Sequence, residues 1–377
     1  VGDRKIYMSS PEYMALYARR LIEVGVRFVG GCCGTTPDHI KAIRDHVAAV
    51  QPTRTASVVA TDLRVPEADL LDPVPLAERS GWGSKLASKG FLTAAEIVPS
   101  AGWDAGPMIE AAKELAGTGV DALTVLDRPR GRSRMAVVPA ASIIGREVGV
   151  ETIIHYTCRD RNMLGMISDL LGAAAGGVNN LLLTSGDPAA LGKLPHSNAV
   201  FDIDSIGLTN VVSQLNRGLD PGGNPIGGPA KFVIGIMAKP SPADPKREVE
   251  RFHWKVEAGA EYAVTQPVFD AQELSRHFER TTLWPLPTIL GIYLAPSLRT
   301  LEFLGGEIPG IRVPKRILAR MRAAQEKSAE HAEAEALAFA HEVLNAVRDK
   351  VRGVYVAAPP GRIDLMTRFL GELELGL

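Results

Sequence analysis

A carboxylic acid lies among apolar neighbours at Glu96, within Leu92–Pro99, which reads LTAAEIVP. Burial among such neighbours disfavours the charged carboxylate and raises its pKa, which suits a proton donor that works near neutral pH. A carboxylate at the same place that pairs with an arginine would serve structure alone. The residues by themselves leave both interpretations open.

Other polar side chains also stand at the ends of apolar runs. Asp187, in TSGDP, would either hydrogen-bond the N–H groups of a heterocycle or cap a turn. Gln266, in TQP, offers one acceptor and two donors to the edge of a planar ligand, or it satisfies backbone groups. His155 is more typical of a structural histidine than of an acid or base. No lysine ends such a run, and Lys255 falls within a helical pattern, which argues against Schiff-base chemistry.

Two adjacent cysteines, Cys32 and Cys33, could bind one soft metal ion. A pair alone does not complete a zinc site, and the third cysteine, Cys158, is far along the chain. Taken in isolation, the pair is more typical of a buried strand end. Three cysteines in 377 residues cannot form a disulfide framework, so we expect a reducing, cytoplasmic compartment.

The elements that must position these residues alternate from residue 90 onward. Eight short apolar or β-branched runs predict strands at 91–97, 120–126, 150–157, 180–185, 231–237, 260–266, 287–293 and 353–357. Helical patterns separate or follow them at 107–117, 137–147, 160–175, 205–217, 246–258, 271–280, 314–350 and 362–373. This alternation predicts an α/β fold, a (β/α)₈ TIM barrel, whose strands bring their carboxyl ends to one rim. A doubly wound sheet is the alternative, disfavoured by the strand count and by the lack of G-x-G-x-x-G after the first strand.

The remaining segments predict a second domain and a linker. Residues 1–50 contain a helix, a strand at 26–29 and a second helix, as in a fragment of another α/β barrel. Residues 51–89 hold scattered prolines and no sustained period, which indicates a linker before the barrel at 90–377. The Ala- and Glu-rich stretch 323–343 is typical of an extended, solvated helix.

The charge balance excludes some classes of partner. The chain has 42 basic and 43 acidic side chains, so no basic excess favours nucleic acid or an anionic membrane. No apolar run reaches the roughly 18 residues that span a bilayer, and the first residues lack the pattern of a secretory signal. Because the sequence begins with Val1, we expect a chain truncated at its front.

Four stretches carry a family resemblance. They are VGGCCGTTP at 29–37, HYTCRDRN at 155–162, FDIDSIGLTN at 201–210 and KVEAGAEYAVTQPVFD at 255–270. With them the chain resembles the bacterial bifunctional homocysteine S-methyltransferase/5,10-methylenetetrahydrofolate reductase family. Roughly residues 1–50 look like the end of the methyltransferase domain, and about 85–377 look like the whole reductase domain.

The resemblance implies a reaction and its cofactors. A TIM barrel would hold FAD at its strand ends, and NADH or NADPH would pass hydride through the flavin to methylenetetrahydrofolate, giving 5-methyltetrahydrofolate. By resemblance, Glu96 is the catalytic acid and Gln266 contacts the pterin. Asp187 is implied as a catalytic residue that binds both pterin and flavin. The implied flavin contacts are His155, Ser185, Gly186, Asp187, Glu248 and Lys255.

The resemblance also implies a zinc site. Cys32 and Cys33 would share Zn with one upstream cysteine and with the thiolate of homocysteine. Since that upstream segment is not in the sequence, we expect the full-length form, and not this chain, to methylate homocysteine. The expected partners are thus small molecules. The oligomeric state is left open, a homo-oligomer included.

Departures from the family pattern concern the flavin. Ser185 stands where related reductases carry Arg, Ala238 stands near a family aromatic, and Leu298 near a family Phe. Arg159, Arg161 or the arginines at 128–134 would have to compensate for the lost cation. Two alternatives therefore stay open: a pterin-binding barrel that transfers methyl groups without redox chemistry, and a folate-binding module without catalysis.

Overall fold

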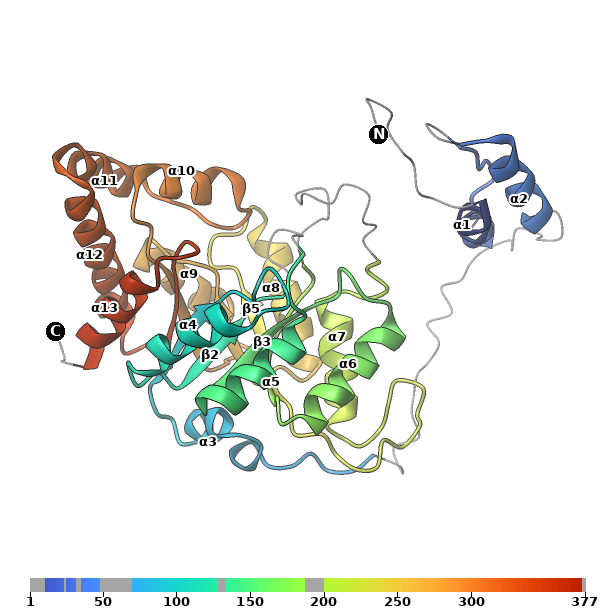
Figure 1. The fold of residues 1–377 in the computed structure, drawn as a ribbon, viewed down its shortest axis with the longest axis horizontal. Helices are drawn as coiled ribbons and strands as arrows, with labels where there is room; N and C mark the ends of the chain where they lie inside the picture. Colours follow the sequence, from blue (N-terminus) through green and yellow to red (C-terminus); the bar gives the residue numbers. More distant parts are fainter. Residues whose placement is uncertain are drawn as a thin grey trace. The chain divides into compact units, whose positions relative to one another are not determined.

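Eight parallel strands pair in sequence order and close into a barrel in the computed structural model (Figure 1). The structure describes residues 11–23, 25–31, 35–47, 70–127, 133–186 and 200–374. The strands are β1 (Leu92–Ile97), β2 (Ala122–Val125), β3 (Glu151–Thr157), β4 (Asn180–Thr184), β5 (Val233–Ala238), β6 (Tyr262–Thr265), β7 (Thr288–Tyr293) and β8 (Gly353–Ala357). Every predicted strand of the barrel is present, so the TIM-barrel prediction is confirmed.

Helices follow the strands and surround the barrel. They are α4 (Gly106–Ala116), α5 (Val137–Val148), α6 (Met163–Ala175), α7 (Ser205–Leu215), α8 (Pro245–Glu257), α9 (Ala271–Arg280), α10 (Leu298–Glu307), α11 (Lys315–Lys327), α12 (Ala329–Val347) and α13 (Ile363–Glu374). Several begin at a side-chain cap; Asp204, for example, accepts from the backbone N–H groups of Ile206 and Gly207 at the start of α7.

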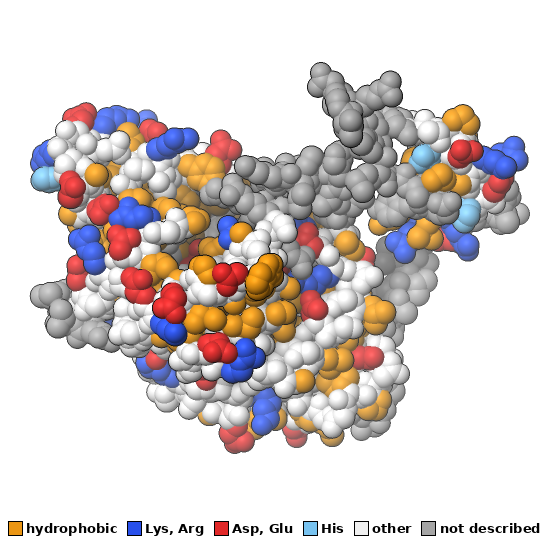
Figure 2. Space-filling view, viewed as in Figure 1, with side chains coloured by type: hydrophobic (Ala, Val, Ile, Leu, Met, Phe, Trp, Pro, Cys, Tyr) orange, Lys and Arg blue, Asp and Glu red, His pale blue; other side chains and the backbone are white. Residues whose placement is uncertain are grey.

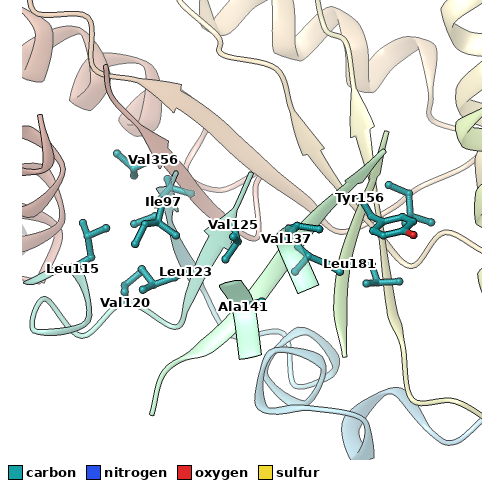
Figure 3. Close-up of a cluster of buried hydrophobic side chains, with 14 of the residues drawn as sticks. Ile97, Leu115, Val120, Leu123, Val125, Val137, Ala141, Tyr156, Leu181 and Val356 are labelled. Atoms are coloured by element: carbon teal, nitrogen blue, oxygen red, sulfur yellow. The ribbon is translucent and has the colours of Figure 1, made fainter. Parts of the chain in front are cut away.

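Alternating side chains give the barrel two apolar layers. Outward-facing residues of the strands pack under the helices, where Ile97, Leu123 and Val125 meet Leu115 of α4 and Val137 of α5 (Figure 3). Inward-facing residues fill the barrel itself, among them Leu92, Ala94, Ile153, Leu182 and Ile289. The interior is therefore packed and leaves the carboxyl rim for function.

The segment 70–89 differs from the predicted linker. It holds a short 3-10 helix, η2 (Leu76–Glu78), and helix α3 (Gly81–Ala87). Trp82 and Leu86 of α3 are buried in the same cluster as the inward-facing strand residues. Because a seven-residue helix presents less than two full turns, its apolar period was too short to recognise in the sequence.

A second difference lies between β7 and β8. The predicted helix 314–350 is two helices, α11 and α12, and Ser328 separates them by capping α12 through its side chain. Helix α12 buries residues such as Phe339 and Leu344, so the stretch 323–343 is not one solvated helix. Helix α10 was not predicted.

The described residues between 11 and 47 belong to a compact unit of their own. Its described part contains α1 (Pro11–Glu23) and α2 (Pro37–Val47), close to the predicted helices. The predicted strand at 26–29 is wrong, because residues 26–31 adopt no strand. A strand needs a neighbour to satisfy its backbone groups, and the described part of this unit offers none.

Candidate active site

The acid Glu96 points into the carboxyl end of the barrel. It lies two residues beyond the inward-facing Ala94 on β1, and Thr124 of β2 lies opposite it in register. Tyr355 of β8 donates a short hydrogen bond from its hydroxyl to Glu96 Oε2. The two side chains thus join the first and last strands of the barrel.

The pKa of Glu96 lies well above that of an ordinary carboxylic acid. Burial raises its pKa to about 7, and the hydrogen bond from Tyr355 lowers it by a smaller amount. Part of the residue still reaches solvent, since its exposure is intermediate. For Tyr355, burial and the nearby Glu96 carboxyl raise the phenol pKa well above its ordinary value, so the hydroxyl remains a donor. A carboxyl with this pKa can hold a proton near neutral pH.

His155 lies beside this pair on β3. Its ring stands 5.8 Å from that of Tyr355, centroid to centroid. Burial lowers the imidazole pKa to about 4, although the charge of Asp127 opposes this shift. His155 Nε2 is buried and has no hydrogen-bond partner among the described residues. The neutral imidazole therefore presents an unsatisfied polar atom.

Ser185 and Gly186 directly follow β4. Ser185 Oγ accepts a hydrogen bond from the backbone N–H of Ser205, at the start of α7. Gly186 has a φ of +88°, and a Cβ there would lie 3.0 Å from Cβ of Arg159, so a larger residue would be both strained and crowded. The predicted Asp187 lies outside the described residues.

Helix α8 carries Lys255, which is buried, and Glu248, which is half-buried. Lys255 is 5% exposed and donates from Nζ to the carbonyl oxygen of Met237. Burial lowers its pKa to about 8, while the nearby Glu248 raises it. Glu248 Oε1 is buried without a hydrogen-bond partner in the described part of the chain.

Gln266 follows β6, on the rim but away from β1. Its Nε2 donates to the carbonyl oxygen of Pro309, 3.2 Å away. Its Oε1 is buried and accepts no hydrogen bond from the residues described. One acceptor therefore remains available to a ligand.

Two arginines follow β3, and both form ion pairs within the protein. Arg161 donates to both oxygens of Asp127 and to Asp169, and it lies over the ring of Tyr156. Arg159 is also buried and forms a two-point ion pair with Asp160. Arg161 is therefore engaged by Asp127 and Asp169, and its expected compensation for the family arginine stays a prediction.

Ala238 and Leu298, the other two departures from the family pattern, have no aromatic ring. Ala238 is fully buried in an apolar cluster, and Leu298 begins α10, where it packs on the cluster around Leu301. Arg134 donates to the carbonyl oxygen of Pro99, and residues 128–132 lie outside the described part.

A cavity of about 490 Å³ opens beside Glu96. Its walls come from the segment after β1, from α4, from the segment after β8 and from α13. Met108, Ile363 and Met366 make it largely apolar, and Arg134 and Asp104 add charge. On the barrel face seen in Figure 2, acidic and basic side chains are interspersed.

Two predicted features fall beyond this description. Cys32 and Cys33 lie outside the described residues. Among the residues described, no group of three His, Cys, Asp or Glu side chains could hold a metal ion. No helix in that part of the chain is both long and apolar enough to cross a bilayer.

With this geometry established, the family model for methylenetetrahydrofolate reductase matches residues 84–357. The chain belongs to the methylenetetrahydrofolate reductase family. This membership confirms the family that the sequence motifs predicted. The model for homocysteine S-methyltransferase matches residues 2–47, which confirms the predicted resemblance of the first segment.

Curated relatives match that first segment. S-methylmethionine–homocysteine S-methyltransferase BHMT2 of Rattus norvegicus is 38% identical over 71 residues, 19% of this chain and 14% of the relative. Betaine–homocysteine S-methyltransferase 1 of Mus musculus is 38% identical over 71 residues, 19% of this chain and 13% of its own length. The chain thus spans less than a fifth of the curated relatives it matches.

A solved structure shares the fold of the reductase. It is an uncharacterized protein from Clostridium thermocellum that binds two copies of 5-methyl-5,6,7,8-tetrahydrofolic acid. The likeness covers 78% of this chain and 99% of that one, with 14% identity and a TM-score of 0.51.

Tyr355 is the residue that sequence reasoning missed. Its signal was weak, because a tyrosine within an apolar strand is indistinguishable from a core residue. Only the closure of β8 against β1 brings its hydroxyl to Glu96.

Proposed function

We propose that this chain reduces 5,10-methylenetetrahydrofolate to 5-methyltetrahydrofolate, with FAD as the bound cofactor and NADH or NADPH as the reductant, in the cytoplasm. The observation that carries the proposal is Glu96, a carboxylic acid at the carboxyl end of β1 with a pKa of about 7 and a cavity beside it. Membership of the reductase family supports the substrate class.

Several polar groups fit a large heterocyclic cofactor. Buried polar atoms normally have hydrogen-bond partners, yet His155 Nε2 and Glu248 Oε1 have none among the described residues. Gly186 leaves the backbone after β4 without a side chain. We assign FAD binding to His155, Ser185, Gly186, Asp187, Glu248 and Lys255. The chemistry that FAD supplies when bound is hydride transfer from the nicotinamide to the folate.

Glu96 provides the proton that the folate requires. Because the carboxyl stays protonated up to about pH 7, it can protonate N10 of the folate bridge near neutral pH. Protonated N10 then leaves the bridging carbon, and the five-membered ring opens to an iminium that accepts hydride. The carboxylate that remains regains a proton from solvent.

The pterin is held by an acceptor and a carboxylate. Gln266 fixes its own amide through Nε2 and directs the unsatisfied Oε1 to a pterin N–H group. To Asp187, which follows β4 in the sequence, we assign a hydrogen bond to the pterin. These contacts orient the ring while Glu96 delivers its proton.

The test uses the purified chain supplied with FAD. We expect NADH or NADPH to bleach the flavin absorption, and methylenetetrahydrofolate to restore it with formation of 5-methyltetrahydrofolate. Glu96→Gln should keep the bleaching and lose about 10²- to 10⁴-fold in folate reduction. Glu110→Gln, an exposed carboxylate on α4, is the matched control and should behave as the parent.

Three outcomes would contradict the proposal. Folate reduction by Glu96→Gln at the parent rate would remove the acid from the mechanism. Tight folate binding without nicotinamide oxidation would favour a binding module. Methyl transfer without any flavin bleaching would favour non-redox chemistry.

For the first segment we propose zinc binding by Cys32 and Cys33, as part of a methyltransferase domain. The match of residues 2–47 to the homocysteine S-methyltransferase model supports this assignment. Zinc content should fall when both cysteines are changed to Ser, and an unchanged content would refute it.

A further inference from the structure

Tyr355 contacts the candidate acid directly. Its hydroxyl donates to Glu96 Oε2, whereas no hydrogen bond from a described residue reaches Oε1. The two residues stand on β1 and β8, the pair of strands that closes the barrel, so rigid backbone holds both. A phenol on a packed strand is a fixed donor, unlike water.

We propose that Tyr355 is the positioning residue of the acid: it occupies Oε2 of Glu96, so that Oε1 carries and delivers the proton. This inference rests on the proposed function of Glu96. A protonated carboxyl holds its proton on either oxygen, and a donor fixed at one oxygen leaves the proton on the other. Tyr355 thereby selects the oxygen that faces the folate.

The same hydrogen bond sets the pH range of the acid. Burial alone drives the carboxyl toward its neutral form, and the donor from Tyr355 opposes that by stabilising the carboxylate. The proton therefore remains transferable near neutral pH instead of being held too tightly. The hydrogen bond from Tyr355 thus partly offsets the rise that desolvation causes in the pKa of Glu96.

Other groups around the pair do not replace Tyr355. Thr124 of β2 lies opposite Glu96 in register, and its hydroxyl has no partner among the described residues. His155 of β3 faces the ring of Tyr355 and is neutral at physiological pH. The charge of Asp127, just beyond the end of β2, raises the pKa of His155 by less than burial lowers it. Tyr293 of β7 acts on Tyr355 electrostatically.

The experiment follows the Glu96 carboxyl itself by infrared difference spectroscopy across pH, with its band identified by loss in Glu96→Gln. We expect the wild-type midpoint near pH 7 and the Tyr355→Phe midpoint higher by about one pH unit or more. Tyr262→Phe is the matched control, since it removes another interior tyrosine hydroxyl, bonded to the carbonyl oxygen of Leu181. Its midpoint should stay at the wild-type value.

Activity provides a second readout. The high-pH limb of kcat/KM should move upward with the infrared midpoint in Tyr355→Phe. An unchanged midpoint in a folded Tyr355→Phe protein would overturn the inference, as would a lower rate without movement of the limb. The two proposals can fail separately. If the Glu96 midpoint shifts in Tyr355→Phe but the wild-type chain has no reductase activity, the proposed function is refuted and the effect of Tyr355 on the pKa of Glu96 is retained.

A second substitution covers a failure of Tyr355→Phe to fold. Fluorotyrosine introduced at position 355 keeps the shape of the ring and makes its hydroxyl a stronger donor. The Glu96 midpoint should then fall below the wild-type value. A midpoint that rises or stays constant would contradict the inference.

Discussion

Trp82 of α3 packs its indole against the ring of Tyr262 on β6, with the ring centroids 5.9 Å apart. Tyr262 fills the barrel interior because Gly235 on the neighbouring β5 leaves space that any side chain would occupy. Trp82 is 2% exposed, and Glu151 of β3 accepts hydrogen bonds from the backbone N–H groups of Gly81 and Trp82. Helix α3 therefore belongs to the barrel and covers its amino end.

The contact between Trp82 and Tyr262 predicts that α3 is part of the folded barrel domain. Trp82→Ala should lower the free energy of unfolding by about 3–5 kcal/mol, because it leaves a large cavity against the barrel interior. Urea denaturation followed by circular dichroism measures it. Trp103→Ala, at an indole that is 93% exposed, is the control and should change stability little. Equal effects of the two substitutions would show that α3 contributes nothing to the core.

Glu96 predicts a pH-dependent stability. Its folded pKa of about 7 lies above the ordinary 4.5, so the folded state binds the proton more tightly between these values. The stability is then fully present below about pH 4.5 and lost as pH rises through 7. Glu96→Gln removes this loss, so at pH 8 it should be more stable than wild type by about 3 kcal/mol. At pH 4.5 the difference should vanish in urea titrations; a gap independent of pH would disprove the raised pKa.

The ion pair between Arg161 and Asp127 predicts a large structural effect. The Asp127 side chain is fully buried, and Arg161 Nη1 lies 2.6 Å from Oδ2. Arg161→Met leaves a buried carboxylate without its cation and should cost about 3–5 kcal/mol in thermal unfolding. Arg312→Met breaks an ion pair of a 74%-exposed arginine with Glu273 and should cost less than about 1 kcal/mol. FAD affinity should survive in folded Arg161→Met; a selective loss would assign Arg161 to the cofactor.

Lys255 predicts a pH-dependent affinity for FAD. Its pKa of about 8 means that the ammonium group loses its proton as pH rises above that value. If the charge holds the anionic cofactor, Kd should increase above pH 8, by as much as about tenfold per pH unit. Fluorescence titration from pH 6.5 to 9.5 measures this, and Lys255→Met should give a flat profile. Lys246→Met, on the exposed side of α8, should retain the wild-type profile.

Periodicity predicted the barrel well because its strands are mostly buried apolar runs and most of its helices are long. It failed for short or interrupted elements: α3 has seven residues, and Ser328 splits α11 from α12 within one continuous helical pattern. In both cases a tertiary contact or a single cap decides the structure, and neither produces a sustained period.

The candidate site was predicted in part. Glu96, His155 and Gln266 could be found because polar residues at strand ends meet at one rim of a barrel. Tyr355 could not, since its role depends on a contact across 259 positions of sequence. The partners of Arg161 could not be predicted from the sequence either, because only the folded chain shows that Asp127 and Asp169 form ion pairs with it.

Within the described part of the chain, helix α3 and the ring of Tyr262 fill the amino end of the barrel, whereas Glu96 lies at the carboxyl rim. Under the proposed function, the nicotinamide and the folate would both arrive and depart at the carboxyl rim, beside Glu96. The two reactants would then bind in turn, and the rate of product release would govern how soon the next molecule can bind.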